Sequence, residues 1–496
     1  MKKRGTIGYW IVAVTTILLF SSCNKPVYDE NAKLTFSLSE VTFDTVFSTI
    51  GSTTQRLMVY NPNNFDITTD IHLASGSNSY YSINVDGLPG VDFDDVEIRA
   101  KDSIFIHIKV TINPGNQNNP FLVTDSIVFN TGNNRQDVDL IAYGQDANFI
   151  VADSQTGNLK YKIVAGAHET TRWTNEKPYV IYGWAAVDSL GELIIDPGTK
   201  IYLHKGSGIW VYRYGHIEVN GTVEEPVIFR GDRKEEWFNT DYSQWDRIWI
   251  NEGTEDNIIN NAIVTNSFVG IQVEALIENL GNKTIITNSI IHNTANTGIL
   301  ARASNLEITN CQISNNGEFS LQLEIGNFEL KHLTIANYFS QTAREKTALY
   351  ISNFYKALVS NGDGTYSYVT YTGNTTSSMV NSIVTGILTN EISTGYNESS
   401  TFNWQLENCL IKTDYTSVNF INCLRNVAPK FTDYQEQDFT LQATSPAIDA
   451  GKSGIGVDYD ILGNFRNGVP DIGAYEYSAE KSNQKFSLRY QLGTLQ

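Results

Sequence analysis

Short runs in which apolar and polar residues alternate dominate the chain between residues 33 and 147. Examples are LTFSLSEVTF, DSIFIHIKVTI and DVDLIAYG, and turn-forming stretches such as DGLPG and NTGNN separate them. Alternation with a period of two predicts half-buried β-strands. About seven such strands are typical of an antiparallel sandwich, so we predict an immunoglobulin-like β-sandwich without chemistry of its own.

A different pattern recurs in the second half of the chain. It consists of an apolar residue, any residue, Asn, two further residues and another apolar residue, in that order. The instances are Ile259-x-Asn261-x-x-Val264, Ile286-x-Asn288-x-x-Ile291, Ile308-x-Asn310-x-x-Ile313, Leu330-x-His332-x-x-Ile335, Met379-x-Asn381-x-x-Val384 and Leu406-x-Asn408-x-x-Ile411. They lie 22 or 27 residues apart, with one interval of 49. A self-similar period in this range predicts a solenoid.

The repeated Asn has a structural explanation. Stacked parallel strands repeat every ~4.8 Å, so a tight turn at the same place in each coil brings like side chains into register. Asn tolerates the left-handed backbone of such turns, and its amide can donate and accept along the stack. We predict an internal Asn ladder in which His332 replaces one Asn and does not bind metal.

Turns before this repeat resemble those of a known fold. Pro197-Gly198-Thr199, Val219-Asn220-Gly221-Thr222 and Pro226-Val227-Ile228-Phe229 follow one another as similar turns do in the entry coils of right-handed parallel β-helix proteins. The resemblance covers residues 179–477 and implies the pectate-lyase-like superfold, in which ligands usually lie along one of three sheets. It implies a fold and not an activity. The expected fold class is therefore all-β, a β-sandwich followed by a right-handed parallel β-helix.

One sheet of these coils carries the candidate site. Its strands are predicted at 245–250, 270–275, 298–303, 320–325 and 348–353. Strict alternation directs ten apolar side chains inward, namely Ile248, Ile250, Ile271, Val273, Ile299, Ala301, Leu321, Leu323, Leu349 and Ile351. The outward side chains are predicted to form two columns, one of Trp249, Glu274, Arg302, Glu324 and Ser352, the other of Arg247, Gln272, Leu300, Gln322 and Tyr350.

Three interpretations of these columns stay open, and two of them involve no catalysis. A solvated ladder of ion pairs would only stabilise the sheet. A carbohydrate-binding surface would use the aromatic side chains of Trp249 and Tyr350 beside the amides of Gln272 and Gln322.

Catalysis by Glu274, Arg302 and Glu324 is the third interpretation. Two carboxylates two coils apart would lie ~10 Å from each other, near the long limit for an inverting glycoside hydrolase. Alternatively, Arg302 would be the base of a polysaccharide lyase, with carboxylates holding Ca²⁺. The acidic clusters of polygalacturonases and pectate lyases are not recognisable in this sequence. We leave enzymatic activity uncertain and favour a protein that is not an enzyme.

An insertion at residues 355–376, YKALVSNGDGTYSYVTYTGNTT, predicts a β-hairpin whose tyrosines could contact a ligand. Its NGDG stretch is interpreted as a turn, because the Glu that completes a calcium loop is missing.

The C-terminal residues also carry a recognisable pattern. Ser445-Pro446-Ala447-Ile448-Asp449-Ala450-Gly451, Asp460-x-x-Gly463-x-x-Arg466 and Asp471-Ile472-Gly473-Ala474-Tyr475-Glu476 resemble a terminal segment of secreted bacterial β-helix proteins, called choice-of-anchor Q. We expect residues 441–477 to cap the solenoid and 478–496 to be a tail. Asp449, Asp460 and Asp471 could surround a cation, and pairing with Arg466 is the simpler expectation.

The first residues predict export. Lys2, Lys3 and Arg4 precede a short apolar stretch, and the ending FSSC resembles a lipobox, so residues 1–22 are expected to be a cleaved lipoprotein signal peptide. Cys23 would then carry lipid and anchor the protein to the outer membrane, on its periplasmic or surface side. Residues 23–32 would form a tether, 33–147 the sandwich, 148–178 a linker and 179–440 the β-helix.

The net charge and the cysteine content restrict the kinds of binding partner and cross-link that we expect. Removal of residues 1–22 takes away three positive charges and no negative one, so the formal net charge falls from −19 to −22. Such a surface repels nucleic acid. The sparse cysteines Cys311, Cys409 and Cys423 are no disulfide framework and are interpreted as small buried residues. We expect an envelope lipoprotein that binds polysaccharide through its β-helix and needs no cofactor except, in the lyase alternative, Ca²⁺. A structural or adhesion protein that binds another protein is the other alternative.

Overall fold

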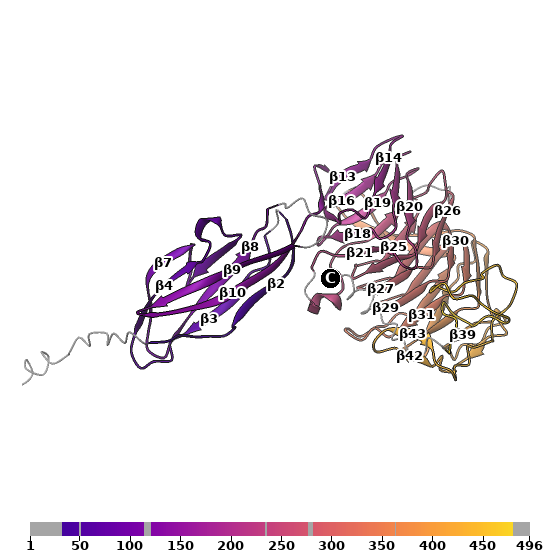
Figure 1. Cartoon of the computed structure of the whole chain (residues 1–496). Coiled ribbons are helices and arrows are strands. Elements are labelled where there is room, and N and C mark those ends of the chain that lie inside the picture. The colour runs from indigo at the N-terminus through magenta and orange to yellow at the C-terminus, as the bar shows by residue number, and fades with distance from the viewer. Residues whose placement is uncertain are drawn as a thin grey trace, which may run out of the picture. The chain divides into compact units, whose positions relative to one another are not determined.

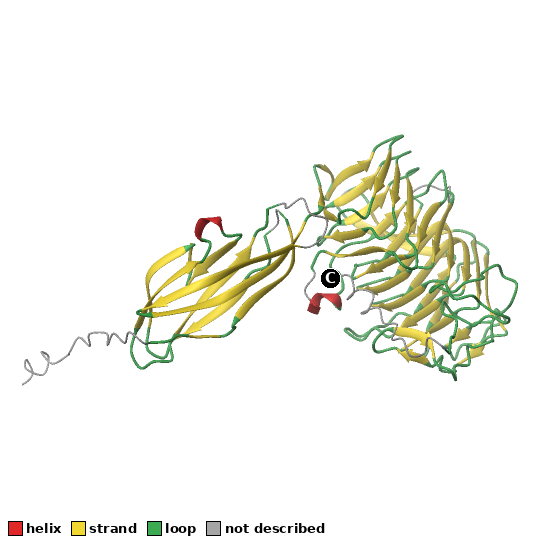
Figure 2. Cartoon of the chain, in the orientation of Figure 1, coloured by secondary structure: helices red, strands yellow, loops and turns green. Residues whose placement is uncertain are grey.

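The computed structural model describes residues 32–48, 51–113, 121–233, 236–275, 281–362 and 364–479 (Figure 1). The predicted signal peptide, Cys23, the tether up to residue 31 and the tail from residue 480 lie outside the described residues. The chain divides into two compact units, Met1–Asp146 and Ala147–Gln496. Strands dominate both units, and the two short helices in Figure 2 are 3₁₀ turns. Among the described residues, no helix is long and apolar enough to cross a membrane.

The first unit is the predicted β-sandwich. Its two five-stranded sheets have the orders β1-β3-β8-β5-β6 and β2-β10-β9-β4-β7. The bounds are β1 Thr35–Phe36, β2 Glu40–Phe47, β3 Gln55–Tyr60, β4 Ile67–Leu73, β5 Tyr81–Val85, β6 Leu88–Gly90, β7 Asp92–Ile98, β8 Ser103–Val110, β9 Phe121–Thr131 and β10 Asn134–Gln145. Leu57 and Ile106 from one sheet and Ile71 and Phe129 from the other are fully buried in a shared core. The alternating pattern predicted this arrangement because strands such as β4, β5 and β8 bury every second side chain.

The second unit is a right-handed parallel β-helix, in which three faces of stacked parallel strands enclose one core (Figure 1). Face 1 consists of β13 Leu159–Ala165, β16 Trp184–Val187, β19 Gly208–Val211, β22 Ile248–Ile250, β25 Ile271–Glu274, the first halves of β28 Ile299–Thr309 and β30 Leu321–Lys331, β32 Leu349–Ser352 and β37 Ile392–Gly395.

Face 2 continues from face 1 in each coil. It consists of β14 Thr170–Trp173, β17 Glu192–Ile195, β20 His216–Asn220, β23 Asn257–Asn260, β26 Lys283–Thr287, the second halves of β28 and β30, β35 Thr375–Val380, β38 Phe402–Glu407 and β40 Phe420–Ile421. Face 3 consists of β11 Asn148–Val151, β15 Tyr179–Tyr182, β18 Lys200–Leu203, β21 Val227–Gly231, β24 Ala262–Thr265, β27 Ile290–Thr294, β29 Gln312–Asn316, β31 Thr334–Asn337, β36 Ile383–Gly386, β39 Leu410–Ile411 and β41 Leu424–Arg425.

The first coil begins earlier than the sequence predicted. Residues 148–178, expected to be a linker, contain β11, β13 and β14, each paired in parallel with a strand of the next coil. The short antiparallel strand β12, Ser154–Thr156, covers the free edge of β13. These outermost strands are only partly buried, and the pattern that marks a fully buried strand is therefore weak in them.

The repeated Asn occupies the turn between faces 2 and 3, as predicted. Its backbone is left-handed in every predicted rung, with φ between 48° at Asn261 and 53° at Asn310 and at His332. Asn310 Nδ2 donates to Asn288 Oδ1 over 3.3 Å. His332 replaces a rung: Nε2 faces the Asn381 amide at 3.1 Å and Nδ1 faces the Gly473 carbonyl at 3.2 Å. Burial lowers the pKa of His332 to about 3, so its imidazole is neutral.

The C-terminal segment packs along the outside of face 3. Six outward apolar side chains of that face share one buried cluster with the segment, namely Ile228, Ile263, Ile290, Ala336, Ile383 and Leu410. In Figure 1 the hairpin of β42 Phe431–Asp433 and β43 Asp438–Leu441 lies beside β31 and β39. Ala474 N donates to Thr334 Oγ1 over 2.9 Å, and the Tyr475 hydroxyl donates to Gln312 Oε1. The segment thus covers the side of the solenoid, where the sequence had suggested its open end.

Candidate functional site

The ten side chains predicted to point inward from face 1 are all buried in the β-helix core. The outward side chains are aligned by the strand register, which pairs Trp249 with Gln272 and Glu274 with Arg302. The predicted columns are therefore wrong in one respect, because Trp249 does not precede Glu274. A shift of two residues keeps every side chain on its face, so alternation alone cannot detect it.

Two outward columns result from this register. The aromatic–amide column consists of Trp210, Trp249, Gln272, Leu300, Gln322 and Tyr350. The charged column consists of Glu274, Arg302, Glu324 and Ser352. Arg247 precedes β22, and its Nη1 donates to Gln272 Oε1.

Glu324 is the most enclosed member of the charged column. Arg302 Nε donates to its Oε2 over 2.6 Å, and Gln322 Nε2 donates to its Oε1 over 2.7 Å. The residue is only 5% exposed. Both carboxylate oxygens therefore have charged or amide donors, as a buried carboxylate requires.

Glu274 shows the same local contact two coils earlier. Gln272 Nε2 donates to Glu274 Oε2 over 2.6 Å, as Gln322 does to Glu324. In both strands the amide stands two residues before the carboxylate, on the same side of the sheet. Hydrogen bonds within a strand thus join the two columns to each other, and the Arg302–Glu324 pair joins neighbouring strands within the charged column. The pattern of alternation did not predict the bonds within a strand.

The predicted hairpin is present and lies against the charged column. It consists of β33 Phe354–Ser360 and β34 Tyr366–Thr372; Asp363 in its turn lies outside the described residues. The Arg302 guanidinium lies 5.2 Å from the centre of the Tyr355 ring, which stacks on Tyr371 at 5.0 Å. Burial, together with nearby Glu274, raises the pKa of Tyr355. Farther out, Tyr366 and Tyr368 are 64% and 74% exposed.

Tryptophans gather at the other end of face 1. The rings of Trp210 and Trp249 stack at 5.5 Å with an interplanar angle of 16°, and Trp184 meets Trp249 edge-on at 6.4 Å. Trp210 Nε1 donates to Asn251 Oδ1 over 2.9 Å. A Cβ at Gly208 would come within 2.7 Å of the Trp184 ring, so glycine makes room for this ring. The sequence signal that was missed is a Trp in three successive strands of one face.

The acidic residues of the C-terminal segment serve mainly as backbone acceptors. Asp471 accepts the amides of Asp449 and Tyr477 over 2.8 and 2.6 Å. Asp460 accepts the Leu462 and Asn464 amides through Oδ1 and the Glu476 amide through Oδ2.

The carboxylate that pairs with Arg466 in this segment is Glu476. Arg466 Nη1 donates to Glu476 Oε2 over 2.9 Å and to the Asp471 carbonyl oxygen over 3.4 Å. Burial raises the pKa of Glu476 to about 7. These contacts hold the loops of the segment together, and the expected pairing with Arg466 is made by Glu476.

Another group of metal-ligand residue types lies on face 2. Atoms of Glu192, His216 and Glu218 that could bind a metal lie within 4.8 Å of one another. His216 Nε2 faces Glu218 Oε1 at 3.5 Å, and Thr170 Oγ1 donates to Glu192 Oε2 over 2.6 Å. One imidazole and two carboxylates are ligands that Zn²⁺ or Mn²⁺ accepts. A single hydrogen bond between His216 Nε2 and Glu218, with Glu192 4.0 Å from the same nitrogen, explains the same geometry.

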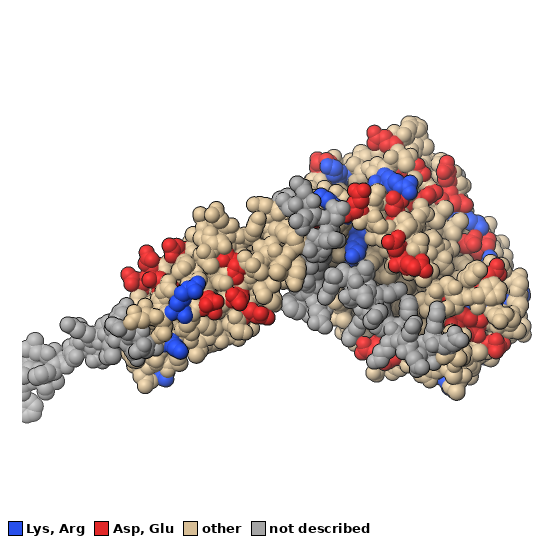
Figure 3. All heavy atoms as spheres, in the orientation of Figure 1, with Lys and Arg blue, Asp and Glu red and all other residues tan. Residues whose placement is uncertain are grey.

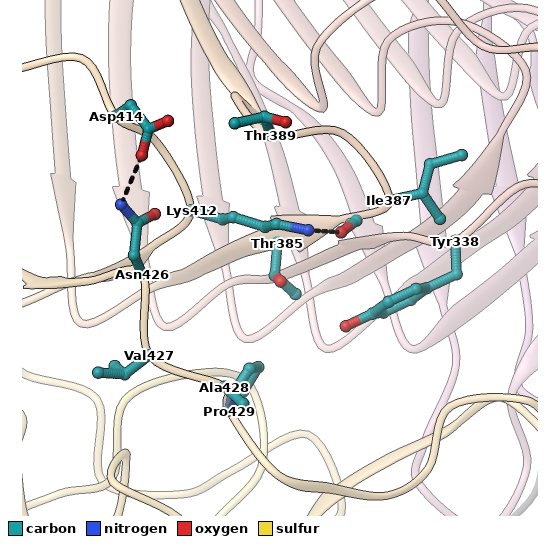
Figure 4. A pocket seen from close by; sticks show the side chains of 11 residues that line it. Tyr338, Thr385, Ile387, Thr389, Lys412, Asp414, Asn426, Val427, Ala428 and Pro429 are labelled. Carbon is teal, nitrogen blue, oxygen red and sulfur yellow. Dashed lines mark hydrogen bonds between the residues drawn. The ribbon is translucent and has the colours of Figure 1, made fainter.

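A cavity of about 480 Å³ opens at the far end of face 3 (Figure 4). Polar residues of its lining form hydrogen bonds with one another. Lys412 Nζ donates to the Gly386 carbonyl over 2.6 Å, and Asn426 Nδ2 donates to Asp414 over 3.0 Å. Tyr338 closes one side. None of the residues predicted from the sequence lies here. Figure 3 shows carboxylates scattered over both units with basic side chains between them.

Comparisons with known proteins give no family. No family model and no curated protein sequence matches the chain. Among solved structures, the ASH/PapD-like domain 7 of human CEP192 is similar at 13% identity over 26% of this chain and 97% of that domain, with a TM-score of 0.17. A protein of unknown function from Porphyromonas gingivalis W83 shares 12% identity over 24% of this chain and 54% of its own, with a TM-score of 0.18.

A family 123 glycoside hydrolase from Clostridium perfringens is similar at 9% identity over 23% of this chain and 28% of its own, with a TM-score of 0.17. At these TM-scores, none of the three structures bears on what the chain does.

Proposed function

We propose that this protein is a non-catalytic envelope lipoprotein that binds polysaccharide along face 1 of its β-helix. The observation that carries the proposal is the register that places the stacked rings of Trp210 and Trp249 in line with Gln272, Gln322 and Tyr350. Aromatic rings offer apolar contact to sugar faces, and each glutamine amide has a second N–H and a second acceptor lone pair beyond those used toward Glu274, Glu324 and Arg247. A row of this kind matches an extended chain ligand better than a compact one.

The pairing of Arg302 favours binding over catalysis. A lyase base must accept a proton from the substrate, whereas Arg302 donates to Glu324 and lies under the ring of Tyr355. Glu324 in turn is buried, and each of its carboxylate oxygens already accepts a hydrogen bond within the face. We therefore assign both residues to the architecture of the binding face.

The cellular setting of the proposal comes from the sequence. The lipobox-like ending before Cys23 supports lipid attachment and export to the outer membrane. The entry-coil turns support membership of the pectate-lyase-like superfold, and the Asp471-Ile472-Gly473-Ala474-Tyr475-Glu476 stretch supports a choice-of-anchor-Q-like segment. We assign to the sandwich the role of a spacer or adhesion module.

The test is a glycan array probed with the full chain, with and without Ca²⁺, beside the double variant Trp210→Ala/Trp249→Ala. A control, Tyr396→Ala, alters an aromatic side chain that is 66% exposed and is not part of either column. We expect the wild type and the control to retain a polysaccharide, and the double variant to retain less. A product with a new unsaturated bond would instead indicate a lyase, and new reducing ends without it a hydrolase.

A protein partner is the second candidate function, and the hairpin favours it. Leu358 pairs across the strands with Tyr368, and both side chains are more than half exposed. Exposed aromatic and aliphatic side chains on a projecting element are typical of protein-binding sites. If no glycan binds while loss of the Leu358 and Tyr368 side chains abolishes capture of envelope proteins, this second function replaces the first.

A further inference from the structure

Two cysteines lie on neighbouring rungs at the C-terminal end of the β-helix. β38 pairs with β40 through Leu406 and Phe420, and β39 pairs with β41 through Leu410 and Leu424. The number of residues between the paired positions is the same before and after the turn between faces 2 and 3. Cys409, which lies in this turn, is therefore beside Cys423. Rungs are spaced by ~4.8 Å, which falls within the Cα–Cα range of ~4.4–6.8 Å found in disulfides.

The backbone directs both side chains alike. Each cysteine follows an Asn with left-handed backbone, Asn408 with φ 49° and Asn422 with φ 51°. Each thiol lies within hydrogen-bonding range of the carbonyl oxygen two residues before it, Cys409 Sγ at 3.3 Å from that of Glu407 and Cys423 Sγ at 3.5 Å from that of Ile421. Cys409 is buried, whereas Cys423 is partly exposed. A reagent from solution would therefore meet Cys423 first.

The two thiols also differ in acidity. Interaction with Cys409 lowers the pKa of the Cys423 thiol, while burial raises the pKa of the Cys409 thiol. Thiolate is the form that attacks disulfides. Exposure and acidity thus both favour Cys423 as the attacking group and Cys409 as the group that completes the reaction.

We propose that Cys409 and Cys423 are joined by a disulfide in the exported protein. The oxidant is a disulfide, either of low molecular weight or in a thiol–disulfide oxidoreductase. The Cys423 thiolate attacks one sulfur of the oxidant and releases the other as a thiolate, which gives a mixed disulfide. Cys409 then loses its proton and attacks Cys423 Sγ, which releases the second thiol of the oxidant. Two protein thiols are oxidised and one disulfide is reduced to two thiols.

The bond would link the last two rungs of the solenoid. Terminal coils have a neighbour on one side only and are the first to fray. A covalent link between adjacent rungs would restrict this opening. Cys311 provides an internal contrast: it occupies the same place in an earlier coil, but the register sets it between Ser289 and Leu333. Three cysteines therefore share one type of position, and only two of them are neighbours.

The test uses the full chain incubated with oxidised glutathione, denatured, alkylated and digested with trypsin. Cleavage after Lys412 separates the two cysteines, so a disulfide leaves two peptides joined and lighter by two hydrogen atoms. We expect this linked pair, with Cys311 fully alkylated. Reduction should lower the temperature at which the β-helix unfolds, and neither Cys409→Ser nor Cys423→Ser should show that response. Cys311→Ser is the matched control and should keep both the linked pair and the response.

The proposal is overturned if Cys409 and Cys423 are alkylated as completely as Cys311 after oxidation. It is also overturned if the linked pair appears only in protein oxidised under denaturing conditions, because the native rungs would then not hold the thiols together. The wild type alone decides both points, so misfolding of a variant cannot obscure them. This experiment does not measure glycan binding. Its result therefore does not depend on whether the proposed polysaccharide-binding function is correct.

Discussion

Arg302 and Glu324 stand on adjacent rungs of face 1, and the guanidinium Nε donates to the carboxylate over 2.6 Å. The Glu324 side chain is 7% exposed and that of Arg302 25%, which makes this pair the enclosed centre of the charged column. A second donor, Gln322, holds the other carboxylate oxygen. The pair fixes the surface on which the proposed ligand would lie.

Removal of one partner of this pair should destabilise the β-helix. Arg302→Leu leaves a buried carboxylate with one donor fewer, a change that costs about 1–3 kcal/mol. Lys283→Ala is the control: its ion pairs with Glu307 and Glu329 on face 2 are more exposed and should contribute less than about 1 kcal/mol. Urea denaturation followed by tryptophan fluorescence measures both. Equal midpoints for the two variants would contradict a buried role for Arg302.

The stability of the β-helix should depend on both the amide side chain and the left-handed backbone of the Asn rungs. Asn381 is buried with φ 51°, and its amide group pairs with the Lys452 N–H and carbonyl over 2.7 and 2.9 Å. Asn381→Ala loses these bonds, at about 1–3 kcal/mol, and leaves a left-handed non-glycine residue, at about 1–2 kcal/mol. Asn381→Gly should lose only the first contribution. Thermal unfolding of the two variants separates the contributions, and an Ala variant as stable as the Gly variant would show that the backbone is unstrained.

Inward residues and Asn turns were predictable because each follows from a period that the sequence carries. The alternation of Ile248 with Ile250 defines a face, and the spacing from Asn288 to Asn310 defines a coil. The position of Trp249 was not predictable, because the alignment of neighbouring strands depends on the loops between them. For the same reason the docking of Tyr475 on Gln312, 163 residues away in sequence, left no periodic signal.

Acid should destabilise the ladder through His332. Its pKa in the fold, about 3, lies below its ordinary value of 6.5, so the unfolded chain binds more protons between these limits. The contribution of the neutral His332 to folding stability is therefore fully present above pH 6.5. It is lost as the pH falls, by up to about 1.4 kcal/mol per pH unit. His332→Asn restores the common rung and should lose less stability in mild acid than the wild type. Thermal midpoints measured against pH test this. Parallel curves would contradict a neutral buried imidazole.

Space beside Gly208 should be required for the tryptophan cluster. A Cβ there would lie 2.7 Å from the Trp184 ring and 2.8 Å from the Arg247 carbonyl oxygen. Because the carbonyl is main chain, Gly208→Ala must displace the ring or the strand, at about 1–3 kcal/mol. Near-ultraviolet circular dichroism should show altered tryptophan signals. An unchanged spectrum with unchanged stability would mean that the rings are not packed as described.

Binding of polysaccharide by the aromatic–amide column is tested by measuring the affinity of the array-selected polysaccharide for the double variant Trp210→Ala/Trp249→Ala. The wild type and the Tyr396→Ala control should bind equally. The double variant, with an intact β-sheet spectrum, should bind at least about tenfold more weakly, a loss of about 1.4 kcal/mol. Affinity equal to that of the wild type would contradict the account and place the ligand elsewhere on the protein.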